Sequence, residues 1–132
     1  MIELKLETIS EIVLGLNDVL PKVKGKTGFR MMRILKHLKP LLKDYEEDKY
    51  LAATQFAKKN EYGHPEIVEE KFQFETPQTF QAYVDLINDI GKKELVLDIE
   101  LISFNDIQID LVDEANPVTG FDLYRIEPLL KD

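Results

Sequence analysis

The stretch that decides the fold is TGFRMMRILKHLKPLLKDYEEDKYLAATQFAKK, residues 27–59. Its apolar residues recur every three or four positions, the spacing that places them on one face of a helix packed on a core. We expect one long helix here, with Thr27 as its N-cap. The stripe predicted to face the core consists of Phe29, Met32, Leu35, Leu38, Leu42, Tyr45, Ala52 and Phe56.

Pro40 lies inside this helical pattern. Proline removes one backbone hydrogen bond and its ring clashes with the preceding turn, so the sequence predicts a kink or a break near residues 37–39. Three more apolar residues, Met31, Ile34 and Leu41, fall beside the main stripe. They widen the apolar arc and favour a second contact surface, within the protein or in an oligomer.

The charges of this region are divided along the chain. Residues 22–43 hold eight bases and no acid, and an acidic run begins directly afterwards at Asp44. The whole chain has 17 bases and 25 acids, a formal net charge of -8. Charge polarised in this way steers and orients a partner. The eight bases are Lys22, Lys24, Lys26, Arg30, Arg33, Lys36, Lys39 and Lys43.

The sequence before this region predicts a strand and a helix. Apolar and charged side chains alternate over residues 2–7, which is typical of a half-buried strand. Thr8 and Glu11 form the Thr-x-x-Glu pattern of a capping box, which predicts that a helix starts there. Apolar residues at helical spacing follow, and Pro21 ends the helix.

The sequence after the long helix predicts four further elements. Alternation within residues 68–75 indicates a short strand, and Thr76 followed by proline indicates a helix start. Gly91 is placed to end that helix in a left-handed conformation. Alternation over residues 94–112, interrupted by an Asn-Asp turn, indicates a β-hairpin. Thr119, with an acid three residues later, predicts one more capped helical turn that ends before the next proline.

Together these elements predict an α+β fold in a single domain over residues 1–132. A small antiparallel sheet, made of the N-terminal strand and the C-terminal hairpin, is expected to pack against two or three helices, one of them long. Apolar residues make up 44% of the chain. That proportion suits a hydrophobic core that needs no disulfide or metal.

The composition excludes several classes of chemistry. The chain has no cysteine, which removes disulfides, cysteine-ligated zinc, iron–sulfur clusters and thiol catalysis. No apolar run approaches the roughly 20 residues that span a bilayer, and the N-terminus lacks the pattern of a signal peptide. We therefore expect a cytoplasmic protein with no membrane partner.

The basic segment, residues 22–43, is the first candidate site. Its loop and helix start combine cations with free helix amides, which attract phosphate and other anions. The opposing interpretation is a solvated helix face whose bases pair with the protein's own acids. The residues predicted to bind a partner are Lys22, Lys24, Lys26, Arg30, Met31 and Arg33.

Carboxylates form the second candidate. Asp98 and Glu100 share one face of a predicted strand, and the hairpin could bring Asp110 beside them. Grouped carboxylates hold Mg²⁺ or Ca²⁺ in metal-dependent enzymes. However, the calcium-loop spacing is absent, and acids on the solvent side of a sheet give the same pattern. The other acids of this region are Asp106, Asp113 and Glu114.

The only histidines, His37 and His64, lie outside any recognisable catalytic pattern. The six glycines form no phosphate-binding array. The sequence therefore predicts no catalytic residue, no cofactor and no metal ligand, and a protein that is not an enzyme.

The run Gly25-Lys26-Thr27-Gly28-Phe29-Arg30, followed by the long helix with its acidic second half, resembles small uncharacterised proteins of tailed bacteriophages and prophages. The resemblance implies a virion-assembly accessory or a modulator of a host factor, found in the host cytoplasm or in the virion. It assigns no activity to any residue.

The predicted function is a non-enzymatic interaction protein that uses its polarised charge to bind a protein partner or a second copy of itself. Two alternatives come from other classes. One is a nucleic-acid-binding protein that uses residues 22–43. The other is a metal-dependent enzyme built on Asp98, Glu100 and Asp110.

Overall fold

The computed structural model describes residues 2–131. The chain divides into two compact units, the first formed by residues up to Leu42 and from Glu94 onward, the second by Lys43–Lys93. Helix α2, Gly25–Phe56, contributes its first part to unit 1 and its second part to unit 2. The prediction of a single domain over residues 1–132 stays a prediction, because compact units can belong to one cooperative domain.

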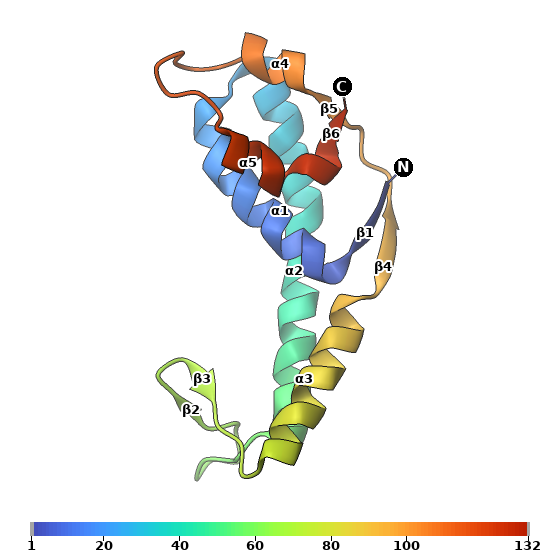
Figure 1. Cartoon of the computed structure of the whole chain (residues 1–132), viewed down its shortest axis with the longest axis vertical. Coiled ribbons are helices and arrows are strands. Elements are labelled where there is room, and N and C mark those ends of the chain that lie inside the picture. The colour runs from blue at the N-terminus through green and yellow to red at the C-terminus, as the bar shows by residue number, and fades with distance from the viewer. Residues whose placement is uncertain (1, 132) are drawn as a thin grey trace. The chain divides into compact units, whose positions relative to one another are not determined.

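Unit 1 begins with a strand that leads directly into a helix (Figure 1). Strand β1, Ile2–Lys5, pairs antiparallel with β4, Glu94–Leu97. Helix α1, Leu6–Val19, starts before Thr8, so the predicted capping box is wrong. Its first residue, Leu6, is buried on the same face as Ile9, and this burial favours the earlier start. A 3₁₀ turn, Leu20–Lys22, follows.

The first part of α2 has a different buried face from the one predicted. Met31, Ile34, Leu35 and Leu38 are buried, whereas Phe29 and Met32 are exposed. The core-facing stripe therefore keeps Leu35 and Leu38 but has Met31 and Ile34 in place of Phe29 and Met32, a turn of less than one residue step, about 100°, around the helix.

Helix α2 also starts at Gly25, two residues before the predicted cap, and it continues through Pro40. Of the two predicted alternatives, the break is therefore wrong, and the kink stays a prediction. Pro40 is exposed, so water can bond the carbonyl group that loses its amide partner.

The C-terminal part of unit 1 contains a helix where the second hairpin strand was predicted. Strand β5, Ile102–Ser103, runs into α4, Phe104–Ile109. The Ser103 side chain accepts a hydrogen bond from the Asp106 amide at 3.1 Å, which is the cap that starts α4. The hairpin prediction over residues 94–112 is thus correct only for β4, which pairs with β1 instead of a neighbouring strand.

Three short elements complete unit 1. Helix α5, Gly120–Arg125, has the predicted cap, because the Thr119 side chain and the third helical residue bond each other's backbone amides. The 3₁₀ turn Glu127–Leu129 leads into β6, Leu130–Lys131, which pairs in parallel with β5. The core residues buried most completely are Ile9, Ile12, Leu16, Val19, Met31, Leu38, Ile102, Ile107, Ile126 and Leu129.

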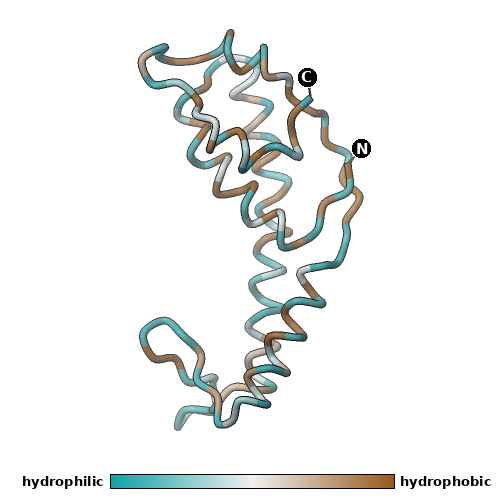
Figure 2. The backbone as a smooth tube through the Cα atoms, in the orientation of Figure 1, coloured by the Kyte–Doolittle hydropathy of each residue, from teal (hydrophilic) through white to brown (hydrophobic). Residues whose placement is uncertain are grey.

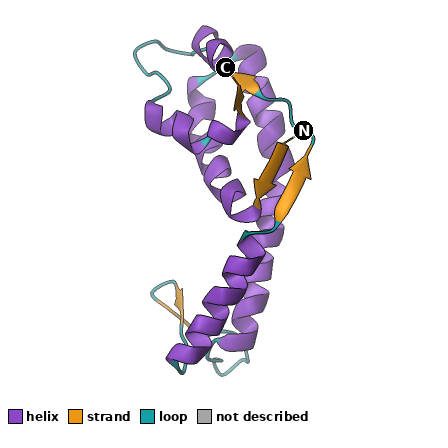
Figure 3. Ribbon diagram, turned by 45° about the vertical axis from the view of Figure 1, so that its right-hand side comes forward, coloured by secondary structure: helices purple, strands orange, loops and turns teal. Residues whose placement is uncertain are grey.

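Unit 2 consists of the second part of α2, a small hairpin and helix α3, Pro77–Gly91 (Figure 3). The hairpin pairs β2, Ile67–Val68, with β3, Lys71–Phe72. The predicted Thr76 cap of α3 is confirmed, but the left-handed end at Gly91 is wrong, since the helix is capped by Lys92 in a right-handed conformation.

Aromatic rings hold unit 2 together. Phe72 packs edge-on against Tyr83 at 6.0 Å between ring centroids, and Phe74 contacts both Tyr83 and Phe80, at 5.1 and 5.3 Å. Apolar residues recur along α3 at helical spacing (Figure 2). The mixture of helices with small two-stranded sheets, two of them antiparallel and one parallel, confirms the α+β class.

Candidate interaction surface

The start of α2 is held by residues from the end of α4. The Asp110 carboxylate accepts a hydrogen bond from the Thr27 amide at 3.2 Å, and the Asp110 carbonyl accepts one from the Lys24 amide at 2.8 Å. The Thr27 hydroxyl donates to the Asp106 carbonyl, and Gly25 adopts a positive φ of 65°. The positive φ suits glycine, because L side chains rarely adopt it.

These contacts occupy the anion-binding position at the helix start. Hydrogen bonds from Thr27 lower the pKa of Asp110, and the nearby cations of Lys24 and Lys26 lower it further, although partial burial opposes them. An ionised carboxylate therefore already balances the positive end of α2. A phosphate bound at this terminus, as the sequence suggested, would have to displace Asp110.

Lys22 is also used within unit 1. Its Nζ donates to Asp122 Oδ2 at 2.9 Å, and the same carboxylate accepts a bond from the Thr119 amide at 3.1 Å. Burial raises the pKa of Asp122, but the bonds from Lys22 and Thr119 outweigh it, so the net effect is a lowered pKa. Lys22 is therefore a structural residue that links the loop before α2 to α5.

Arg30 and Met31 are likewise engaged. Arg30 donates to the Leu101 carbonyl at 3.0 Å and forms an ion pair with Glu100 at 3.1 Å. Met31, which was also predicted to bind a partner, is fully buried in the core of unit 1 and is not accessible at the surface. Of the six predicted residues, Lys24, Lys26 and Arg33 remain as exposed cations.

The structure adds two residues that the sequence placed in the core. Phe29 and Met32 are 60% and 57% exposed on α2, next to a hollow of about 440 Å³. Lys36, also exposed, follows Met32 by about one turn on the same helix face. We call this hollow, together with Lys36, the basic groove. The hollow is lined by Leu20, Pro21, Val23, Lys24, Gly25, Gly28, Phe29 and Met32.

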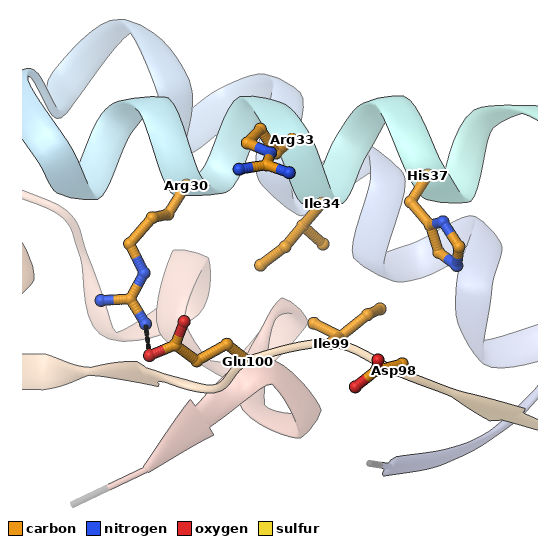
Figure 4. Close-up of a pocket in the computed structure, with 7 residues that line it drawn as sticks. All are labelled: Arg30, Arg33, Ile34, His37, Asp98, Ile99 and Glu100. Atoms are coloured by element: carbon orange, nitrogen blue, oxygen red, sulfur yellow. Dashed lines mark ion pairs between the residues drawn. The ribbon is translucent and has the colours of Figure 1, made fainter.

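A second pocket of about 290 Å³ lies on another face of the first part of α2. Arg30 and His37 point from the helix toward the segment that carries Glu100 and Asp98 (Figure 4). Among residues 2–131, His37 forms no ion pair with either carboxylate. The pocket therefore presents mixed charges without a paired base and nucleophile. Its other lining residues are Arg33, Ile34 and Ile99.

The predicted carboxylate site is not assembled. Asp98 and Glu100 border the mixed-charge pocket, whereas Asp110 caps α2. Within the described part of the chain, no three side chains of the metal-binding types come together. The other histidine, His64, is exposed in a loop of unit 2, where its amide donates to the Asn60 side chain.

Unit 2 presents an acidic counterpart on the second part of α2. A shallow hollow of about 520 Å³ is lined by Lys43, Glu46, Glu47, Tyr50 and Leu51, and we call it the acidic surface. Tyr50 and Leu51 are 42% and 58% exposed. Glu46 forms an ion pair with Lys49 at 3.1 Å. This surface combines two carboxylates, one lysine and two exposed apolar side chains on one helix.

Comparisons with protein-family models, with curated proteins and with solved structures find no match to this chain. Over residues 2–131, no helix has the length and apolar character needed to cross a bilayer.

Proposed function

We propose that the protein is a binding protein without enzymatic activity, and that its basic groove holds an acidic, amphipathic segment of a protein partner. The observation that carries this proposal is the exposure of Phe29 and Met32 beside a hollow, with Lys24 and Lys36 close by. Adjoining exposed apolar side chains next to a hollow are typical of an interaction site.

The chemistry of the groove defines the partner. Burying a phenylalanine or methionine side chain contributes roughly 1.5–3 kcal/mol, which is the main attraction that Phe29 and Met32 can offer. The lysines favour a partner that carries carboxylates, and they orient its approach. A helix with apolar residues on one face and acids beside them meets both requirements.

Nucleic acid is the less favoured ligand of the same surface. Lys22 and Arg30 are paired with the protein's own acids, and Asp110 occupies the start of α2. Binding to a phosphate backbone depends on free cations. Each contact between a cation and a phosphate that is lost lowers both the affinity for nucleic acid and the salt dependence of that affinity. Phe29 and Met32 lie among these bases, and apolar side chains serve a protein partner better than a phosphate backbone.

The test is fluorescence anisotropy with three labelled probes. They are a synthetic helical peptide of glutamates with leucines along one face, a scrambled peptide of equal composition, and a DNA oligonucleotide. We expect the amphipathic peptide to bind with a dissociation constant of about 10–100 µM, and Met32→Glu to weaken that binding at least about tenfold. Leu14→Glu is the matched control, because Leu14 is exposed on α1 and does not line the hollow.

Equal binding of the two peptides would reject the groove as an apolar site. Tighter binding of DNA, lost on raising the salt concentration, would replace the proposal with the nucleic-acid alternative. The role of the partner in virion assembly or in modulating a host factor is proposed from the sequence resemblance alone.

A further inference from the structure

We infer that the segment recognised by the basic groove is the acidic surface of unit 2 in a second copy of this chain. This inference rests on the proposed function, because it identifies the partner of the same groove. Two surfaces that complement each other on one chain favour association between copies.

The two surfaces carry an excess of opposite charges. Lys24 and Lys36 belong to the basic groove, whereas the acidic surface is lined by Glu46 and Glu47 with a single base, Lys43. Glu46 is shared with Lys49, but over residues 2–131 no ion pair involves Glu47 or Lys36. Both side chains are exposed, so they are available to pair with each other between copies.

The apolar residues match in the same way. The groove presents Phe29 and Met32, and the acidic surface presents Tyr50 and Leu51, all more than 40% exposed. Aromatic side chains and methionine are enriched where protein surfaces meet. Contact between the two pairs would remove four large apolar side chains from water in each copy-to-copy contact.

Unit 2 has a second segment that combines acids with exposed apolar residues, but the acidic surface is the better occupant of the basic groove because it is helical. Ile67 and Val68 are also exposed and are followed by Glu69 and Glu70, but they are consecutive residues of strand β2. Consecutive side chains of a strand point to opposite faces, so both cannot enter one groove. On a helix, residues 47, 50 and 51 lie three and four positions apart and share a face.

The test uses two variants that each block one surface. Met32→Glu combined with Lys36→Glu reverses the basic groove, and Glu47→Lys combined with Leu51→Lys reverses the acidic surface. All four side chains are exposed, so each variant should keep the fold, which circular dichroism checks. Leu14→Glu serves again as the control.

The average molecular mass of the protein in solution is measured by sedimentation at protein concentrations up to about 0.5 mM, at which weak association is detectable. We expect wild type and the control to associate, more weakly at high salt. Each blocked variant alone should associate at least about tenfold more weakly. An equimolar mixture of the two variants should associate again, because each supplies the surface that the other lacks.

Three outcomes overturn the inference. If wild type stays monomeric at every concentration while the amphipathic peptide binds the groove, the partner is not a second copy and the proposed function stands. If wild type associates but the blocked variants do so equally, the contact between copies lies elsewhere. If wild type is monomeric and does not bind the amphipathic peptide, both the proposed function and the association between copies are rejected.

Discussion

Gly15 provides a direct test of how α1 and α5 pack in unit 1. It is buried in the middle of α1, and a Cβ atom added there would lie 2.8 Å from Ile126 Cγ2 and 2.9 Å from Arg125 Cβ. Carbon atoms pack at about 3.5–4.0 Å, so the end of α5 and the residue after it must move by roughly 0.6–1.2 Å to admit the methyl group. Arg125 Cβ is bonded to the backbone, so turning a side chain cannot relieve that contact.

Two opposing effects set the expected result of Gly15→Ala. Alanine stabilises a helix interior by about 1 kcal/mol relative to glycine. Overpacking of a close-packed core costs about 1–3 kcal/mol, and here it affects two contacts at once. We therefore expect a net loss of roughly 1–2 kcal/mol in the free energy of unfolding, the opposite sign from an exposed site.

Urea unfolding followed by circular dichroism measures this free energy, and hydrogen exchange in α1 assigns the change to unit 1. Gly120→Ala is the matched control, because a Cβ there meets no atom within 4 Å. We expect the control to change stability by less than about 0.5 kcal/mol. If Gly15→Ala is more stable than wild type by about 1 kcal/mol, α1 and the end of α5 do not approach as closely as described.

Three further outcomes follow from the contacts of unit 1. Asp122→Ala leaves the Lys22 ammonium unpaired and should lower stability by about 2–3 kcal/mol in thermal unfolding, less than for a fully buried pair because the Lys22 side chain is 19% exposed. The pKa of Asp122 is lowered in the folded protein, so its ionised carboxylate contributes its full share to the free energy of unfolding at pH values above the ordinary pKa of 3.8. This contribution is lost as the pH falls through the folded pKa. The stability of Asp122→Asn should therefore decline less on acidification than that of wild type. Ser103→Ala removes the cap of α4 and should cost about 1 kcal/mol in urea unfolding, with faster exchange in α4.

Local signals predicted several elements correctly. The helix starts at Thr76 and Thr119 were readable because a capping side chain bonds a backbone amide only a few residues away. Alternation over the first residues correctly indicated β1. The cap of α4 was equally readable in the Ser103-x-x-Asp106 spacing, but the alternation of apolar residues in the same segment favoured a strand. A short run of apolar residues fits both the two-residue period of a strand and the 3.6-residue period of a helix, so this error arises from the sequence pattern itself.

The candidate site depended on which side of α2 faces the core, and the sequence could not settle that. The apolar residues covered a wider arc of the helix than one contact requires. Two rotations of the helix about its axis, each burying a different set of these residues, were therefore consistent with the sequence. Burial of Met31 left Phe29 and Met32 exposed. The internal partners of Lys22 and Arg30 lie 100 and 71 residues away in the sequence. Pairings over such separations leave no periodic signal, so the basic segment appeared freer than it is.

The way unit 1 is assembled from two parts of the chain bears on its biosynthesis. Unit 2 is one uninterrupted stretch, complete once Lys93 has left the ribosome. At that moment β1 still lacks β4, and the apolar face of α1 still lacks Ile126 and its neighbours. At about 5–20 residues per second, the remaining residues to 131 take roughly 2–8 s to appear. During those seconds a nascent chain exposes the apolar face of α1 and an unpaired strand edge, the features that chaperones bind.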